Sequence, residues 1–216
     1  MNTDGGESSS MTGDGTNIKR MSLKRKYEIR DNATAIAIWS EDIVLDPGNV
    51  RHPIRVVMVD NELTTRFDRL VSLPKNCATY IYRVLDHGIP WQHLDSCITL
   101  EDVKQRIIEL TKGKRLVVYD AWKTIGLFDF TEQQVSRLKV YDLKSSSKSK
   151  GPDGEPWSYW DLVREKLGHI YTGKPGNYDA IELTDFMMRI YLKYTSSAKK
   201  DDDSPTFDND ATGINA

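Results

Sequence analysis

The order of apolar segments between residues 33 and 194 constrains the fold of this chain most strongly. Three segments rich in β-branched residues come first, at residues 33–41, 54–59 and 64–73, and short polar connections separate them. Apolar runs of this length that end at turn residues are typical of strands. The connection at residues 46–49, Asp-Pro-Gly-Asn, is a strong turn signal. We therefore expect a meander of three strands at the start of the folded body.

Helical and strand patterns alternate in the rest of the chain. Residues 100–110 place apolar side chains at helical spacing, Thr99 with Asp102 resembles a capping box, and Gly113 stands where the helix would end. This order predicts a single α/β domain in which helices flank a mixed sheet. The remaining expected elements are strands at 116–119 and 138–141, helices at 121–128, 157–167 and 179–194, and a loop at 144–156.

The bulk properties exclude several classes of protein. The 216 residues carry a net charge of −2, so any contact with nucleic acid must come from a local basic patch. Cys77 and Cys97 cannot form a disulfide framework or a zinc site, and they fit a reducing compartment. No apolar run approaches the ~20 residues of a membrane span, and the N-terminus lacks the order of a signal peptide. We expect a soluble intracellular protein.

Two polar tails are expected to flank a folded domain at residues 32–195. Residues 1–31 and 196–216 contain too few apolar side chains to offset the entropy of ordering the chain, which predicts disorder. A basic run near the end of the first tail is typical of a nuclear-import signal or a phosphate-contacting arm, although a solvated tail boundary has the same composition. The run favours the nucleus over the cytoplasm, and its members are Lys19, Arg20, Lys24, Arg25 and Lys26.

Several short motifs occur in a fixed order along residues 34–191. They are Trp-Ser-Glu at 39–41, His-Gly-Ile at 87–89, Leu-Val-Val-Tyr-Asp at 116–120 and Leu-Gly-His-Ile-Tyr-Thr-Gly at 167–173. In order and spacing they resemble the small eukaryotic 3′–5′ RNA exonucleases of the DEDD superfamily. The resemblance implies a ribonuclease-H-like fold. It also implies two-metal phosphodiester hydrolysis, in which four carboxylates hold two cations and a His or Tyr orients the attacking water.

The positions that correspond to the first metal-binding acids depart from this pattern. Trp39 occupies the position of the leading acid, whereas Glu41 keeps the second. Thr124 stands at the next acid position, and Asp120, one helical turn earlier, could substitute for it in part. Two divalent cations need several carboxylate oxygens around them. The resemblance therefore implies that the catalytic chemistry has been lost or rebuilt. The indole of Trp39 would either fill the former metal site or offer a surface on which a base can stack.

The last acidic motif admits two registers. Counting back from residues 187–191 places Leu183 at the acid position and Tyr178 at the water-orienting position. Matching Asp179 to the family's acid keeps the carboxylate, but it requires a helix one turn longer and places Lys174 at the base position. The sequence leaves both registers open.

Two further Asp-x-Glu motifs are predicted to be turn residues. Asp60 and Glu62 follow an apolar strand, but only eight residues separate Glu62 from Val71. That distance leaves no room for the two strands that follow the first motif in the family. Asp153 and Glu155 lie in the polar loop, where acids shape turns.

A basic loop with neighbouring aromatic residues is the candidate nucleic-acid surface. Lys144, Lys148 and Lys150 lie in this loop, and Trp157 and Trp160 follow it. Lysines contact phosphates and aromatic rings stack on unpaired bases in single-strand binding. Core packing is the alternative for the two tryptophans.

These patterns favour an exonuclease-fold protein that binds single-stranded RNA, or docks onto protein partners in an RNA-processing assembly, without efficient catalysis and without a cofactor. An active enzyme is the first alternative. It would use Glu41, Asp120 and Asp179, with Tyr178 orienting water, and it would need Mg²⁺ or Mn²⁺. The second alternative is a protein-interaction scaffold that no longer meets nucleic acid.

Overall fold

The first three strands form the meander that the sequence predicts. The computed structural model describes residues 32–46, 50–74, 78–79, 89, 94, 97–170 and 179–197. Within them, β1 (Ala35–Asp46) pairs with β2 (Val50–Asp60), and β2 pairs with β3 (Thr65–Leu70), in both cases antiparallel. β3 ends earlier than the predicted segment 64–73, because its pairing with β2 ends at Leu70.

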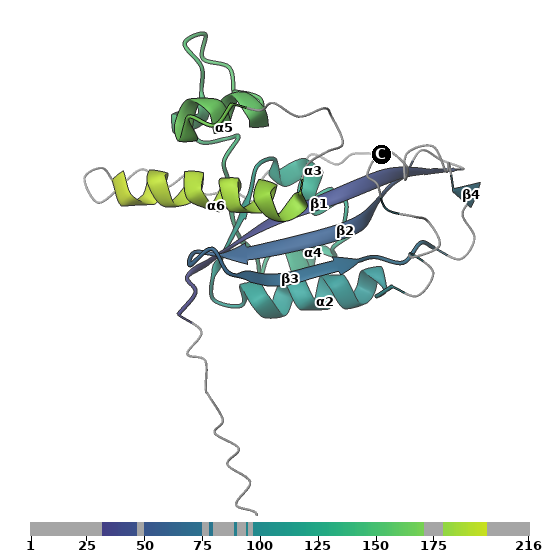
Figure 1. Cartoon of the computed structure of the whole chain (residues 1–216). Coiled ribbons are helices and arrows are strands. Elements are labelled where there is room, and N and C mark those ends of the chain that lie inside the picture. The colour runs from purple at the N-terminus through teal and green to yellow at the C-terminus, as the bar shows by residue number, and fades with distance from the viewer. Residues whose placement is uncertain are drawn as a thin grey trace, which may run out of the picture. The chain divides into compact units, whose positions relative to one another are not determined.

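A parallel half extends the sheet on the other side of β1. β5 (Arg115–Val118) pairs with β1, and β6 (Lys139–Asp142) pairs with β5, both parallel. The order is β3-β2-β1-β5-β6, and the short β4 (Ala78–Thr79) lies against the far end of β1. The predicted mixed sheet is therefore confirmed (Figure 1).

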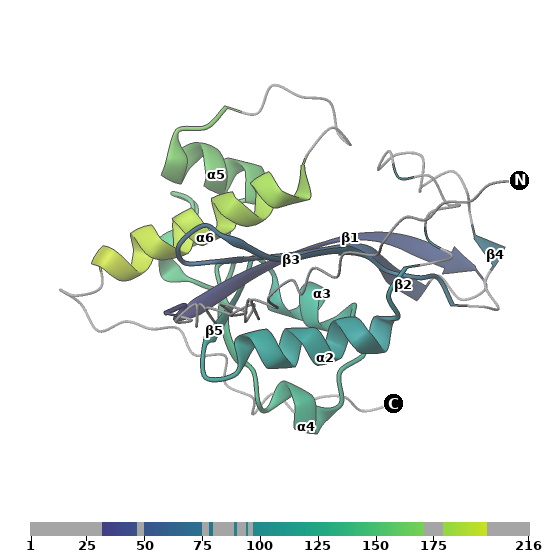
Figure 2. The ribbon, with the colours of Figure 1, turned by 60° about the horizontal axis from the view of Figure 1, so that its bottom comes forward.

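Helices cover both faces of this sheet (Figures 1 and 2). Ile36 and Ala37 are consecutive residues of β1 that belong to opposite buried cores, because alternate side chains of a strand face opposite sides. The predicted α/β layering is thus confirmed. One face carries α2 (Leu100–Thr111), α3 (Ala121–Gly126) and α4 (Glu132–Val135), and the other carries α6 (Ala180–Ser197) with α5 (Tyr159–Leu167) packed beside it.

The ends of α2 follow from local chemistry. The Thr99 hydroxyl accepts a hydrogen bond from the backbone N–H of Asp102 at 3.1 Å, and the Asp102 carboxylate accepts one from the Thr99 N–H at 3.3 Å. This is the predicted capping box. Gly113 follows the helix with φ +75°, a backbone conformation that glycine adopts without a steric penalty.

Several boundaries differ from the predicted ones. The helix predicted at 157–167 begins at Tyr159, because the Ser158 hydroxyl caps it by accepting from the N–H of Asp161 at 3.2 Å. The short α4, whose capping box is formed by Thr131 and Gln134, is too brief to leave a periodic pattern. The predicted loop at 144–156 contains a 3-10 turn at Ser147–Ser149.

The strand β1 has an open edge. It continues to Asp46, five residues beyond the predicted end at Glu41. This extension is held in place because Leu45 is buried in a small core that is separate from the two main ones. β5 pairs with β1 only over residues 35–37. Along the described part of the chain, the edge of β1 that faces β5 therefore has no strand partner from residue 38 to 44.

Some predictions fall on other parts of the chain. Residues 1–31 with the basic run at 19–26, residues 198–216 of the predicted second tail, and Tyr178 lie outside the described residues. The predicted start of the second tail at 196 is wrong, because α6 continues to Ser197. No helix among the described residues is both long and apolar enough to cross a membrane.

Candidate functional site

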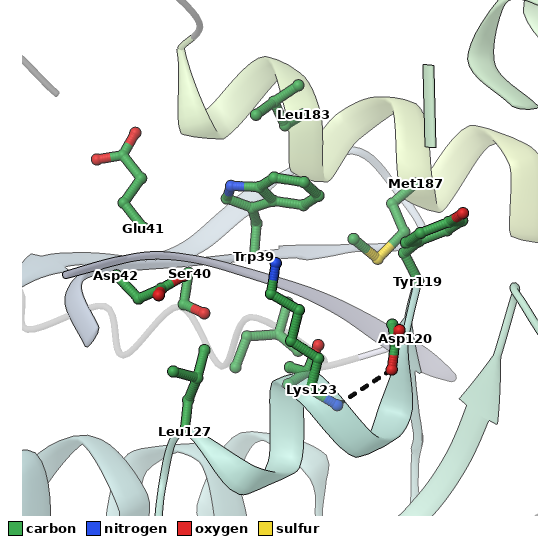
Figure 3. A pocket seen from close by; sticks show the side chains of 12 residues that line it. Trp39, Ser40, Glu41, Asp42, Tyr119, Asp120, Lys123, Leu127, Leu183 and Met187 are labelled. Carbon is green, nitrogen blue, oxygen red and sulfur yellow. Dashed lines mark hydrogen bonds between the residues drawn. The ribbon is translucent and has the colours of Figure 1, made fainter. Parts of the chain in front are cut away.

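A pocket of about 280 Å³ lies where the open edge of β1 meets α3 and α6 (Figure 3). It forms beyond the carboxyl end of β5, which is the place where open α/β sheets most often bind ligands. Its lining is more apolar than polar. The lining residues are Ile38, Trp39, Ser40, Glu41, Asp42, Tyr119, Asp120, Lys123, Thr124, Leu127, Leu183 and Met187.

Two positions at which the resemblance implies acids, Trp39 and Thr124, meet in this pocket, together with Leu183, the acid position in one of the two registers. Glu41 lines the pocket from the same side of β1 as Trp39 (Figure 3). Side chains two residues apart on a strand share a face, which accounts for this pairing. The indole and the leucine side chain offer no metal ligand, and the threonine offers one neutral hydroxyl.

The two registers of the last motif differ in where they place the acid. Leu183 lies inside α6 and lines the pocket. Asp179 precedes α6, accepts a hydrogen bond from the backbone N–H of Ile181 at 3.0 Å, and does not line the pocket. Its carboxylate lies 3.5 Å from the guanidinium of Arg55. Only the register that assigns the acid position to Leu183 therefore places that position in the pocket.

Aromatic packing holds Trp39 in place. The centroid of its ring lies 4.9 Å from that of Tyr159, with 45° between the ring planes. Tyr159 is buried, and its hydroxyl donates to the backbone carbonyl of Leu183. Burial raises the pKa of Tyr159 well above its ordinary value, so the hydroxyl stays protonated and keeps this hydrogen bond. Tyr119 packs edge-on against Tyr159 with centroids 5.2 Å apart.

Asp120 is engaged by neighbouring groups. Its carboxylate accepts a hydrogen bond from the backbone N–H of Lys123 at 3.1 Å and so caps α3. The other oxygen lies 2.7 Å from the ammonium of Lys144. Burial alone would raise the pKa of Asp120, but the hydrogen bonds from Lys144 and Lys123 outweigh it and lower the pKa. The same contact raises the pKa of Lys144.

Arg55 places a positive charge among the acids on the other side of β1. It lies opposite Glu41 in the pairing of β1 with β2, and its guanidinium makes two hydrogen bonds of 3.0 Å to Asp68. The hydrogen bond with Asp68 is the main cause that raises the pKa of Arg55, and the charges of Glu41 and Asp179 add to it. A fixed guanidinium thus supplies positive charge close to the one acid that the first motif retains.

The residues around the pocket do not fit a two-metal centre. Asp42 pairs with Arg51 at 2.6 Å, and Asp120 pairs with Lys144. In the described part of the chain, no three His, Cys, Asp or Glu side chains gather in a way that could hold a metal ion. A pair of divalent cations requires several carboxylates at once. The donor set present therefore disagrees with the one that the resemblance implies.

The lysines of the predicted basic loop have unequal surroundings. Lys144 is held by Asp120 at the rim of the pocket. The Lys148 ammonium donates to the backbone carbonyl of Tyr194 at 2.9 Å, which ties the loop to α6. Lys150 is exposed. The loop is therefore anchored at two of its three lysines.

The two candidate tryptophans of this region are half-buried beside α6. The ammonium of Lys166 lies 4.4 Å from the ring centroid of Trp157. Trp160 packs edge-on against Tyr159, with centroids 5.6 Å apart. Both rings belong to the apolar layer between α5, α6 and the sheet. These contacts account for both tryptophans through packing, and neither lines the pocket.

Sequence reasoning missed two cationic residues of the site. Lys123 lines the pocket beside Thr124, and Arg55 lies across from Glu41. Arg55 interrupts an otherwise apolar run at 54–59. A charge in the middle of a buried strand requires a partner, so this interruption was the available signal.

The remaining Asp-x-Glu motifs shape turns, as predicted. The buried carboxylate of Asp60 accepts hydrogen bonds from the N–H groups of Glu62 at 2.8 Å and Thr64 at 3.0 Å. The Asp153 carboxylate accepts from the N–H of Glu155 at 3.1 Å. Neither motif contributes to the pocket.

The fold is shared with solved exonuclease structures. The catalytic unit of Neurospora crassa Pan2, with its protease and nuclease domain, matches 82% of this chain at 19% identity and a TM-score of 0.59. A full-length 3′-exonuclease matches 77% at 20% identity and a TM-score of 0.53. A Saccharomyces cerevisiae Pan2 module in complex with AAGGAA RNA matches 81% at 16% identity and a TM-score of 0.57.

These matches establish the fold. The chain spans 29%, 62% and 30% of the three matched chains, in the same order. No protein-family model matches the sequence, and no curated protein does so. The predicted resemblance to exonucleases and the predicted α/β fold class are therefore confirmed at the level of the fold.

Proposed function

We propose that this protein is an exonuclease-fold RNA-binding protein that has lost two-metal catalysis. One observation carries the proposal: Trp39 and Thr124 line a single pocket at two positions where the resemblance implies metal-binding acids, together with Leu183, the acid position in one of the two registers. Without these ligands the site lacks the means to lower the pKa of a bound water and to stabilise a leaving oxygen. The protein binds RNA, or docks in an RNA-processing assembly, without cleaving its ligand efficiently.

The surroundings of the pocket support this proposal. Glu41 and Asp120 are the acids that an active enzyme would still have to use there, and Asp120 is held by Lys144 and by the N-terminus of α3. The pocket itself is retained as an open cavity with an aromatic wall. The matched S. cerevisiae Pan2 module is in complex with RNA, which makes RNA the first ligand to test.

A paired degradation and binding experiment tests the proposal. Purified protein is incubated with 5′-labelled single-stranded RNA and Mn²⁺, and the same RNA is titrated in EDTA at several salt concentrations. We expect no shortening of the RNA, and we expect binding in EDTA that weakens as salt rises. Glu41→Gln is the matched control, since it removes the retained acid of the first motif and keeps the size of the side chain.

Two outcomes would contradict the proposal in different ways. Degradation by the wild type that Glu41→Gln abolishes would establish an active enzyme. An absence of binding to any single-stranded RNA at low salt, with the fold intact, would leave the scaffold role in place of RNA binding.

A further inference from the structure

We propose that the pocket beside β1 takes the base of one unpaired nucleotide, stacked against Trp39, in the place where the resemblance implies two metal ions. This inference rests on the proposed RNA-binding function and names what the site recognises. Trp39 is then the specific contact, and the backbone phosphates lie outside the pocket.

The indole of Trp39 is prepared for stacking. The ring contacts Tyr159, with centroids 4.9 Å apart and 45° between the planes, and it also packs against the buried cluster of Val57, Val59 and Ala180. Tyr159 is itself fixed through the carbonyl of Leu183. The indole is half-buried and lines the pocket. A ring that is already ordered loses little side-chain freedom when a ligand binds. Every nucleobase has a π-face, so an aromatic wall of this kind accepts bases with little regard to sequence.

The charges around the pocket argue for a neutral ligand. Asp42 lies 2.6 Å from Arg51, Asp120 lies 2.7 Å from Lys144, and Arg55 lies across the strand pair from Glu41. A divalent cation would have to compete with the basic side chains that already pair with the carboxylates of Asp42 and Asp120. A phosphate inside the pocket would lie among the carboxylates of Glu41, Asp42 and Asp120, which line it. A neutral planar group avoids both costs.

Polar side chains of the pocket suit the edge of a base. The hydroxyl of Thr124 donates and accepts hydrogen bonds, and Glu41, on the same side of β1 as Trp39, accepts them. The open edge of β1 adds backbone groups from residues 38–42, which line the pocket. Exposed Lys123 stands at the pocket, where it can meet the phosphate of the same nucleotide.

The size of the pocket selects one base rather than a duplex. Its volume of about 280 Å³ lies just below the range for small-molecule sites, roughly 300–1,000 Å³. A base can enter such a cavity only when it is unpaired and unstacked from its neighbours. The ligand is therefore a single-stranded segment or a strand end.

Anisotropy titrations with labelled single-stranded hexanucleotides test this inference, with RNA and DNA of the same sequence as separate arms. Trp39→Leu keeps an apolar side chain and removes the ring, so we expect affinity to fall at least about tenfold. Trp39→Phe keeps a ring and should stay within about threefold of the wild type. Trp122→Leu is the matched control, because Trp122 is 76% exposed and does not line the pocket.

A second measurement covers the case in which Trp39→Leu fails to fold. Adenosine and ribose 5-phosphate are titrated separately into isotope-labelled wild-type protein, and the indole N–H signals are followed by NMR. We expect adenosine to shift the signal assigned to Trp39, and we expect ribose 5-phosphate to leave it in place.

The outcomes separate this inference from the proposed function. If the wild type binds the hexanucleotides and Trp39→Leu binds them equally well, the base pocket is wrong while RNA binding stands. A shift of the Trp39 signal by ribose 5-phosphate and not by adenosine would also overturn the base pocket. If the wild type binds no RNA at all, the proposed function itself fails.

Discussion

The ammonium of Lys144 lies 2.7 Å from the carboxylate of Asp120, one helical turn before the position at which the resemblance implies an acid. The two residues come from opposite ends of a connection that includes α3, α4 and β6. Because of this contact, the carboxylate of Asp120 is a structural group and not a candidate metal ligand. The same carboxylate also caps α3.

The first prediction concerns this pair. Asp120→Ala should lower the free energy of unfolding by about 1–2 kcal/mol, because it removes the N-cap of α3. Lys144→Met should cost less, about 0–1 kcal/mol, because the lysine side chain is 43% exposed and the ion pair is screened by water. Urea denaturation at pH 7 measures both values. Equal losses for the two variants would show that the ion pair, and not the cap, is the main contribution, because Asp120→Ala removes both.

The pH dependence of this effect has a defined sign. The folded protein lowers the pKa of Asp120, so its stabilising contribution is fully present above the unfolded pKa of about 3.9. The contribution is lost as the pH falls through the folded pKa. We expect the stability difference between wild type and Asp120→Asn to shrink between about pH 5 and pH 2. A difference that grows on acidification would contradict the assignment.

The second prediction concerns Arg55, which joins β2 to Asp68 of β3 and to Asp179 at the start of α6. Arg55→Met should lower the free energy of unfolding by about 1–3 kcal/mol, because it leaves partly buried carboxylates without their cation. Mn²⁺ should then raise the Tm of the variant more than that of the wild type. Arg51→Met is the matched control, because it releases only Asp42. Equal Mn²⁺ effects in all three proteins would show that Arg55 does not replace a cation.

Local patterns were enough to predict much of the fold. The β-branched runs predicted the meander, and Thr99 with Asp102 predicted the start of α2, because strands and caps depend on residues that are close in sequence. The site was predictable only in part. The contacts of Asp120 with Lys144 and of Arg55 with Asp179 join residues 24 and 124 positions apart, and no local pattern records them. The register of α6 was open for the same reason, since it depends on which side chain faces β1.

The third prediction separates the lysines of the basic loop. Lys148→Ala should lower the free energy of unfolding by about 0.5–1.5 kcal/mol, because its ammonium donates to the carbonyl of Tyr194. Lys150 is exposed, so Lys150→Ala should leave stability unchanged. If the loop is an edge of the RNA surface, Lys150→Ala lowers the salt slope of RNA binding by up to ~0.7. An unchanged slope would show that Lys150 is only solvated.

The last prediction concerns the restoration of an acid in place of Trp39. The indole packs on Tyr159 and lines the pocket beside Glu41. Trp39→Asp should therefore lower the free energy of unfolding by about 2–4 kcal/mol, less than for a fully buried tryptophan, because Trp39 is only half-buried. Trp39→Asn leaves the same space without the charge and is the matched control.

Calorimetric titration with Mn²⁺ then isolates the effect of the carboxylate. We expect Trp39→Asp to bind Mn²⁺ more tightly than both Trp39→Asn and the wild type, because the introduced carboxylate would join that of Glu41 on one face of β1. RNA degradation should stay absent, because Thr124 and Leu183 still supply no carboxylate. Equal, negligible binding by all three proteins, with no change in stability, would show that the side chain at this position does not face the former metal site.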